Sequence, residues 1–142
     1  MKCYAVIDTN VLVSALLSSH NDAATVQVVD KIFSEEIVPL YSTEIIAEYN
    51  AVLHRKKFKF SDDSINILLS VIEQNGIFVF PNASGEILPD MKDLPFYEVV
   101  LEKQNKDAYL VTGNIKHFPQ KPFVVTPNQL LEIFKRDDDA DM

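Results

Sequence analysis

The stretch Val6-Ile7-Asp8-Thr9-Asn10-Val11-Leu12-Val13 decides the fold of this chain. An apolar run from Tyr4 to Ile7 stops abruptly at a carboxylate, and a second apolar run begins after two small polar residues. This pattern predicts a buried strand that ends at Asp8 and turns directly into a helix. In open α/β sheets, ligands bind at the carboxyl ends of the strands, so a functional site is expected at Asp8.

The composition is that of one compact domain with a single core. The chain has 142 residues, of which 47% are hydrophobic, and a net charge of −8. This charge argues against binding polyanions through a broad basic face, but a carboxylate pocket filled by a divalent cation would attract phosphate. Cys3 is the only cysteine, which excludes a disulfide framework. Without a signal-peptide pattern or a membrane-spanning run, we expect a cytoplasmic protein.

Apolar periodicity predicts strands and helices that alternate along the whole chain. Strands are expected at residues 4–7, 37–41, 77–80, 108–111 and 123–125. Helices are expected at residues 11–17, 23–34, 42–55, 61–75, 93–104 and 126–134. Such alternation predicts an α/β fold with a mainly parallel sheet covered by helices on both faces. We assign residues 1–135 to this domain and residues 136–142 to an acidic, disordered tail.

Two glutamates on the helix at 42–55 are candidates to join Asp8. Glu44 and Glu48 are four residues apart and therefore lie on one helical face. Glu48 borders the buried stripe that includes Tyr49, whereas the dipole of the helix already explains a carboxylate at Glu44 in the first turn. We therefore favour Glu48, although a solvent-facing glutamate is the ordinary alternative for either position.

Asp93 is a further candidate, at the start of the helix that follows the third strand. It can cap this helix, with Pro95 in the first turn, and a carboxylate that caps a helix can also bind a metal. Asp90 precedes the helix and is assigned to the loop. The last candidate is Asn114, which follows the fourth strand at the same sheet edge as Asp8; taken alone, a Gly-Asn pair there is a simple turn.

Carboxylates that meet without a lysine or arginine repel one another. Such a cluster persists when a hard divalent ion such as Mg²⁺ or Mn²⁺ neutralises it through oxygen ligands. Thr112 and Asn114 could add a hydroxyl and an amide oxygen to a site of this kind. The residues alone thus predict a divalent-cation site at the carboxyl edge of the sheet.

Four segments together resemble the PIN-domain family, and most closely the PIN proteins that act as toxins in bacterial toxin–antitoxin systems. The segments are Val6 to Leu12, the helix that carries Glu48, Asp90 to Phe96, and Tyr109 to Asn114. The resemblance spans Lys2 to about Phe134. It implies a three-layer α/β/α sandwich around a mainly parallel five-stranded sheet, so that residues 1–135 form a PIN domain.

The resemblance also implies a Mg²⁺- or Mn²⁺-dependent endoribonuclease that cuts single-stranded or loop RNA. The family's three acids, which are catalytic residues and metal ligands, fall on Asp8, Glu48 and Asp93. Its fourth catalytic position, often an aspartate, falls on Asn114, with Thr112 in support. The asparagine removes one negative charge, which bears on how tightly a second ion would bind.

Several other residues are expected to contact the substrate. Those beside the acids are Thr9, Asn10 and Thr112. Arg55 and Lys57 belong to the only basic cluster and could hold an RNA backbone, although cations are also favoured at the carboxyl end of any helix. His117 is assigned no catalytic role. The expected partners are RNA, a small antitoxin protein and a second copy of the chain in a homodimer, with no membrane.

Two other functions remain open at this point. The first is a catalytically inert PIN-like module that binds RNA or protein, which Asn114 keeps open. The second is a hydrolase that uses Asp8 as a nucleophile to form an aspartyl phosphate. That chemistry typically needs a second acid two residues later, where this chain has Asn10.

Overall fold

The structure is a computed structural model, and it describes residues 2–140. The strands within this range are β1 (Cys3–Ile7), β2 (Ile37–Tyr41), β3 (Ile77–Phe78), β4 (Tyr109–Val111) and β5 (Val124–Val125). The α-helices are α1 (Thr9–Leu17), α2 (Ala24–Phe33), α3 (Thr43–Leu53), α4 (Asp62–Asn75), α5 (Leu94–Glu102) and α6 (Pro127–Ala140). Short 3₁₀ turns are η1 (Lys56–Phe58), η2 (Met91–Asp93), η3 (Gln104–Lys106) and η4 (Ile115–His117).

The five strands form one sheet in the order β3-β2-β1-β4-β5, and every neighbouring pair is parallel. The expected mainly parallel sheet is therefore confirmed. β1 is the central strand, and its last residue, Ile7, pairs with Val111 at the end of β4. The residues that follow these two strands, Asp8 and Thr112, consequently emerge side by side at the carboxyl edge.

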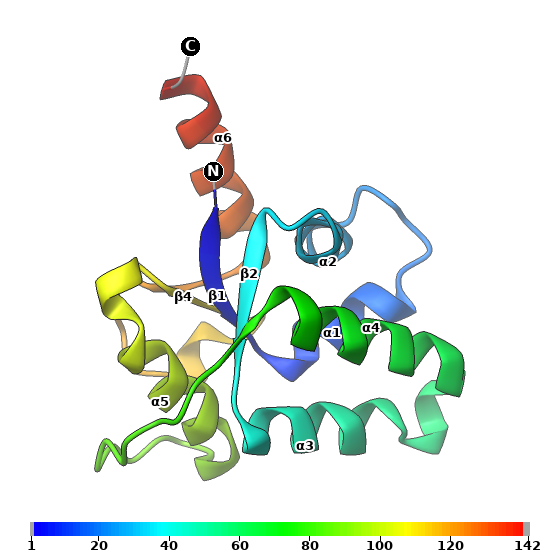
Figure 1. Ribbon diagram of the computed structural model, residues 1–142, viewed down its shortest axis with the longest axis horizontal. Coiled ribbons are helices and arrows are strands. Elements are labelled where there is room, and N and C mark those ends of the chain that lie inside the picture. The colour runs from blue at the N-terminus through cyan, green and yellow to red at the C-terminus, as the bar shows by residue number, and fades with distance from the viewer. Residues whose placement is uncertain (1, 141–142) are drawn as a thin grey trace.

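Helices cover both faces of the sheet. α5 packs against β1, β2 and β4 on one face. Figure 1 shows α1, α2 and α4 on the other side of β1 and β2, where α2 also contacts α6. α3 lies at the carboxyl edge and contacts α1, α4 and α5. Because both faces are covered, Ala5, Val6 and Ile7 of β1 are all buried, as the unbroken apolar run predicts.

The carboxyl end of the chain differs from the prediction. The sequence predicts a helix that ends near Phe134, followed by a disordered tail at 136–142, but α6 continues to Ala140. No glycine or proline follows Phe134, so nothing in the sequence stops the helix there. Residues 141 and 142 of the predicted tail lie outside the described residues. Along the described part of the chain, no helix is both long and apolar enough to cross a membrane.

Candidate functional site

Asp8 is the buried carboxylate at the centre of the carboxyl edge, with 6% of its surface exposed. Its backbone N–H donates to the carbonyl of Val111 (2.9 Å), which fixes it beside β4. Its Oδ2 accepts hydrogen bonds from the hydroxyl of Thr112 (2.7 Å) and the amide of Asn10 (3.2 Å). Burial raises the pKa of the Asp8 carboxyl, and the hydrogen bond from Thr112 opposes this rise.

Asn10 and Thr112 tie the two strand ends together. The side-chain amide of Asn10 bridges the two strand ends. Its nitrogen donates to Asp8, and its oxygen accepts a hydrogen bond from the backbone N–H of Gly113 (3.2 Å). Thr112 is fully buried, and its hydroxyl also accepts from the N–H of Asn114 (3.0 Å). Both side chains therefore hold Asp8 in place, which is a positioning role.

Glu48 is the glutamate of α3 that the structure brings to Asp8. The buried hydroxyl of Thr9 donates a hydrogen bond to Glu48 Oε2, whereas Glu44 is exposed. Burial raises the pKa of Glu48, and the negative charge of Asp8 raises it further, while the hydrogen bond from Thr9 lowers it. The preference for Glu48 over Glu44 thus agrees with the geometry, and Thr9 positions the glutamate.

A buried tyrosine fixes α3 against the sheet. Tyr49 follows Glu48, and its hydroxyl donates a hydrogen bond to the carbonyl of Ile7, the last residue of β1. At the start of the helix, the hydroxyl of Ser42 accepts from the N–H of Ile45 (3.3 Å) and caps it. The border between the buried and exposed faces of α3 therefore falls at Glu48, next to the end of β1.

Asp93 reaches the site without acting as a helix cap. Its carboxylate makes no capping hydrogen bond to α5, although Pro95 lies in the first turn as predicted. The cap of the preceding turn η2 is Asp90, whose Oδ1 accepts from the N–H of Lys92 (3.0 Å). Burial raises the pKa of Asp93 to about 6, and the charges of Asp8 and Asp90 contribute to this rise. Asp90 is thus a further acid whose charge acts on the site.

Asn114 contacts His117 rather than the acids. Its side-chain nitrogen lies 3.0 Å from Nε2 of His117, and His117 Nδ1 lies 3.4 Å from Oδ2 of Asp93. The charge of His117 lowers the pKa of both Asp8 and Asp93. His117 is therefore a member of the site that the sequence did not predict, and its place three residues after Asn114, in the turn η4, is the only signal that could have indicated it.

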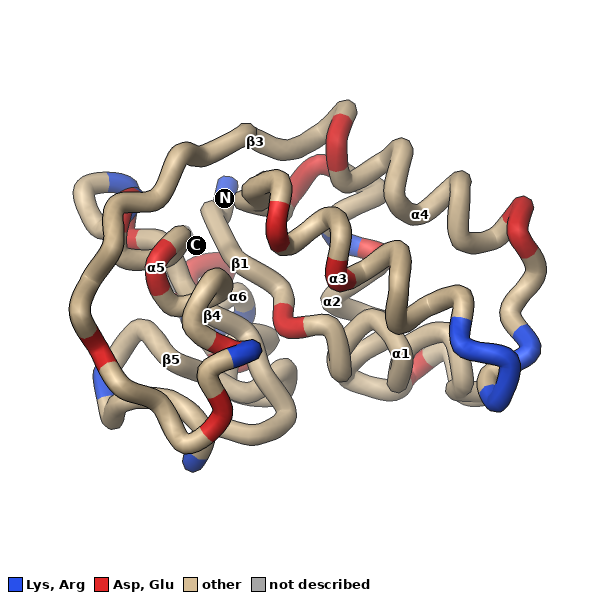
Figure 2. Tube along the Cα trace, turned by 90° about the horizontal axis from the view of Figure 1, so that it is seen from below, with Lys and Arg blue, Asp and Glu red and all other residues tan. Residues whose placement is uncertain are grey.

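The two predicted basic residues differ in their relation to the acids. Arg55 is exposed, and its positive charge lowers the pKa of Glu48. Lys57 lies over the ring of Phe58, with its Nζ 5.1 Å from the ring centroid. Figure 2 looks at the carboxyl edge and shows the Lys and Arg residues that follow α3 gathered beyond the end of that helix, away from the end of β1. Of these two residues, Arg55 is the one whose charge acts on an acid of the site.

The donor chemistry of the site suits a hard divalent cation. Asp8, Glu48 and Asp93 offer only oxygen atoms, and besides burial the charge of Asp8 raises the pKa values of both Glu48 and Asp93. Between residues 2 and 140, no group of three or more histidine, cysteine, aspartate or glutamate side chains lies close enough together to hold a metal ion. Mg²⁺ keeps several of its waters and needs only one or two carboxylates, so the residues fit such an ion.

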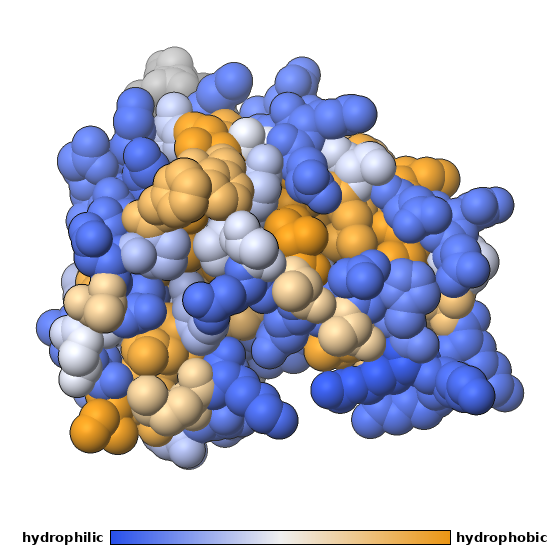
Figure 3. Space-filling model, turned by 60° about the horizontal axis from the view of Figure 1, so that its bottom comes forward, coloured by the Kyte–Doolittle hydropathy of each residue, from blue (hydrophilic) through white to orange (hydrophobic). Residues whose placement is uncertain are grey.

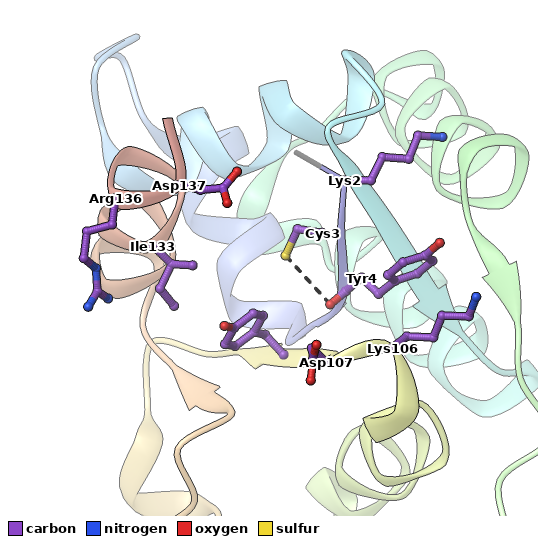
Figure 4. Close-up of a pocket in the computed structure, with 9 residues that line it drawn as sticks. Lys2, Cys3, Tyr4, Lys106, Asp107, Ile133, Arg136 and Asp137 are labelled. Atoms are coloured by element: carbon purple, nitrogen blue, oxygen red, sulfur yellow. Dashed lines mark hydrogen bonds between the residues drawn. The ribbon is translucent and has the colours of Figure 1, made fainter. Parts of the chain in front are cut away.

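The shape of the molecule agrees with this position for the site. Figure 3 shows that the face containing the carboxyl edge is hollowed by a notch between two lobes. A hollow of about 650 Å³ lies at the opposite edge, where β1 and β4 begin (Figure 4). Its charged residues are of both signs, and burial raises the pKa of its Cys3 thiol to about 12, which leaves no thiolate nucleophile. The size of a hollow therefore does not identify the site in this molecule.

Comparisons with known proteins agree with the architecture. A family model described as the PIN domain matches residues 4–116. The uncharacterized protein MJ1680 of Methanocaldococcus jannaschii is 27% identical over 117 residues, which cover 80% of this chain and 72% of that protein. The crystal structure of PAE2754 from Pyrobaculum aerophilum superposes with a TM-score of 0.55 at 17% identity, covering 95% of this chain and 90% of the other. At this identity, the structural likeness bears on the fold alone.

Proposed function

This chain belongs to the PIN-domain family, whose members are generally nucleases, and from this premise we propose that it is a Mg²⁺- or Mn²⁺-dependent endoribonuclease. The observation that carries the proposal is the set of three carboxylates from three segments, Asp8, Glu48 and Asp93, whose pKa values are all raised. Partly buried acids whose ionised forms are disfavoured gain most from a divalent counter-ion.

In this proposal, Asp8 would be the principal ligand of the ion, and Glu48 and Asp93 would bind it directly or through its waters. A bound divalent cation supplies neutralisation of the acids and Lewis-acid stabilisation of the phosphate. Thr112 and Asn10 keep the Asp8 carboxylate oriented, and Thr9 does the same for Glu48. Asn114 assists through His117, which it contacts and which faces Asp93.

The proposed substrate is single-stranded or loop RNA. Asp8 is 6% exposed and lies below the surface of the site, so a rigid duplex backbone would reach it poorly. A flexible, unpaired strand can bend a phosphate toward recessed acids. Arg55 and Lys57 are exposed near the end of α3 and supply positive charge for the RNA backbone.

The test is cleavage of labelled single-stranded and duplex RNA in Mn²⁺ or Mg²⁺. Wild type should cut the unpaired RNA, and Asp8→Ala or a chelator should abolish most cleavage. Glu44→Ala is the matched control for Glu48→Ala, because Glu44 is on the same helix but exposed, and it should keep full activity. Cleavage that survives both Asp8→Ala and chelation would contradict the mechanism.

We further propose that this nuclease is the toxin of a toxin–antitoxin pair, held in check in the cytoplasm by a small antitoxin. The support is the likeness of the segments around Asp8 and Thr112 to bacterial PIN toxins. Expression of wild type in a bacterium should slow growth, and expression of Asp8→Ala should not. Equal growth with both variants would contradict the toxin role.

One observation favours an inert PIN-like binding module instead. Asn114 stands where the family often has an acid, and in the described residues its side chain contacts His117 and no carboxylate. An inert module would bind RNA with the same affinity in wild type and in Asp8→Ala, and would cut none of it. Cleavage that depends on both Asp8 and a metal excludes this alternative.

A further inference from the structure

A second hollow lies in the segment that joins β4 to β5, on both sides of His117 in the chain. Its volume is about 330 Å³, within the range of small-ligand sites. It adjoins the site because Ile115 and Lys116 precede His117 in the same turn η4, and His117 Nδ1 is 3.4 Å from Asp93. A ligand in this hollow would therefore be a neighbour of a phosphate held by the acids.

The lining of this hollow combines apolar surface with positive charge. Its residues include Ile115, Lys116, Phe118, Pro119, Gln120 and Lys121. Phe118 is buried and packs into the core, whereas Ile115 is 41% exposed at the rim. An exposed isoleucine beside a hollow contributes little to the core and offers apolar surface to a ligand.

Backbone hydrogen bonds hold the hollow in shape without a ligand. The N–H of Phe118 donates to the carbonyl of Ile115 (3.2 Å), and the N–H of Val124 donates to the carbonyl of Lys121 (3.1 Å). Pro119 restricts the backbone between these two turns. A pre-formed site of this kind loses little conformational freedom when it binds.

The two lysines are available for a negatively charged ligand. Both are exposed, and among the described residues neither lies within 4.0 Å of a carboxylate oxygen. In a chain with a net charge of −8, two lysines at one hollow next to the acids provide local attraction for phosphate.

We propose that this hollow binds an unpaired nucleobase of the RNA, next to the phosphate held at the acids. A nucleobase has apolar faces, one of which can pack on the exposed side chain of Ile115, and a polar edge, which the amide of Gln120 can both donate to and accept from. Lys116 and Lys121 meet the flanking phosphates. This inference rests on the proposed function, and it adds that the protein binds one base of the RNA substrate as well as its phosphate.

The test measures binding in the Asp8→Ala variant, so that the RNA stays intact. Fluorescence anisotropy compares a short single-stranded RNA with copies that each carry one abasic position. At one position, the missing base should weaken binding about tenfold, the usual order for the loss of one stacked base. Adding Ile115→Ala should remove this difference, whereas Ile67→Ala, at an exposed isoleucine on α4, should keep it.

The lysines give a second, independent readout. Lys121→Ala should lower the slope of log affinity against log salt by about 0.7, one phosphate contact with single-stranded RNA, while Lys106→Ala at the opposite sheet edge should leave it unchanged. The inference is overturned if no abasic position matters, if Ile115→Ala behaves like Ile67→Ala, or if no RNA binds. Base-dependent binding without any cleavage by wild type would overturn the nuclease proposal and leave the base site standing.

Discussion

The two edges of the sheet place different chemistry at opposite ends of the same two strands. At the carboxyl edge, β1 and β4 end in Asp8 and Thr112, which are buried and hydrogen-bonded to each other. At the amino edge, the hollow of about 650 Å³ is lined by charged residues of both signs, including Asp137 on α6 (Figure 4). The comparison teaches that burial and convergence of like charges, rather than the volume of a hollow, distinguish the functional edge.

The largest expected difference between the edges is in activity. Asp8→Ala should lower RNA cleavage by about a hundredfold or more, because the three acids act as one unit. Asp137→Ala, the matched change at the amino edge, should leave cleavage unchanged. Single-turnover rates in Mn²⁺ measure both. An equal loss of cleavage in Asp8→Ala and Asp137→Ala would contradict the assignment of the activity to the carboxyl edge.

The pH dependence of stability gives the next largest difference. Asp93 has a folded pKa of about 6 against an ordinary 3.8, so the folded state binds the proton more tightly than the unfolded state. The free energy of unfolding of the metal-free protein should therefore fall as the pH rises from about 4 to about 6, by on the order of 2 kcal/mol. Urea titrations in chelator at several pH values measure this change.

Two variants test whether Asp93 causes this dependence of the free energy of unfolding on pH. Asp93→Asn should remove most of it, whereas Asp137→Asn at the amino edge should preserve it. Saturating Mn²⁺ should flatten the slope as well, since a bound cation favours the ionised acids. A free energy of unfolding that rises with pH over this range in wild type would contradict the repulsion among the acids.

A smaller effect is expected from the residue that orients Asp8. Thr112→Val removes the hydroxyl that donates to Asp8 Oδ2 and keeps the shape of the side chain. Cleavage should fall about tenfold, the usual scale for an outer-shell partner of a metal ligand. Tyr109→Phe, which removes a hydroxyl near the amino end of β4, is the control and should retain full activity. Loss of cleavage in Tyr109→Phe but not in Thr112→Val would contradict the role given to Thr112.

The smallest effect concerns the stability of the metal-free protein. Asp8→Asn removes a charge that burial disfavours, while its amide oxygen can still accept from Thr112. In chelator at pH 7, the variant should be equal to wild type or more stable by up to about 1 kcal/mol. Thermal melts measure the difference. A clear destabilisation would mean that the Asp8 charge supports the fold instead of being tolerated for function.

Much of the fold could be predicted because the local pattern and the fold agree. The apolar run before Asp8 predicts β1, and the alternation of elements predicts the parallel sheet, which the structure confirms together with the family. The end of the last helix could not be predicted well, since residues 136–140 are acidic but contain no residue that stops a helix. Strand order depends on packing between distant segments, which no single stretch of sequence carries.

The site was predicted less completely than the fold, for physical reasons. Glu48 could be preferred because it borders the buried stripe of α3 beside Tyr49, which is a local property. Asp93 could be selected as the site candidate, but the capping role considered for it belongs to Asp90, which only the geometry of the turn η2 shows. His117 was missed since its contact with Asp93 joins segments that lie far apart in the sequence.

The most direct measurement is the binding of Mn²⁺ to the full chain, followed by the loss of its free-ion electron paramagnetic resonance signal. Wild type and Asp137→Ala should bind the ion with equal affinity, and Asp8→Ala should bind it at least about tenfold more weakly. A wild-type protein that binds no Mn²⁺, or an Asp8→Ala variant that binds it as tightly as wild type, would contradict a cation site built from these acids.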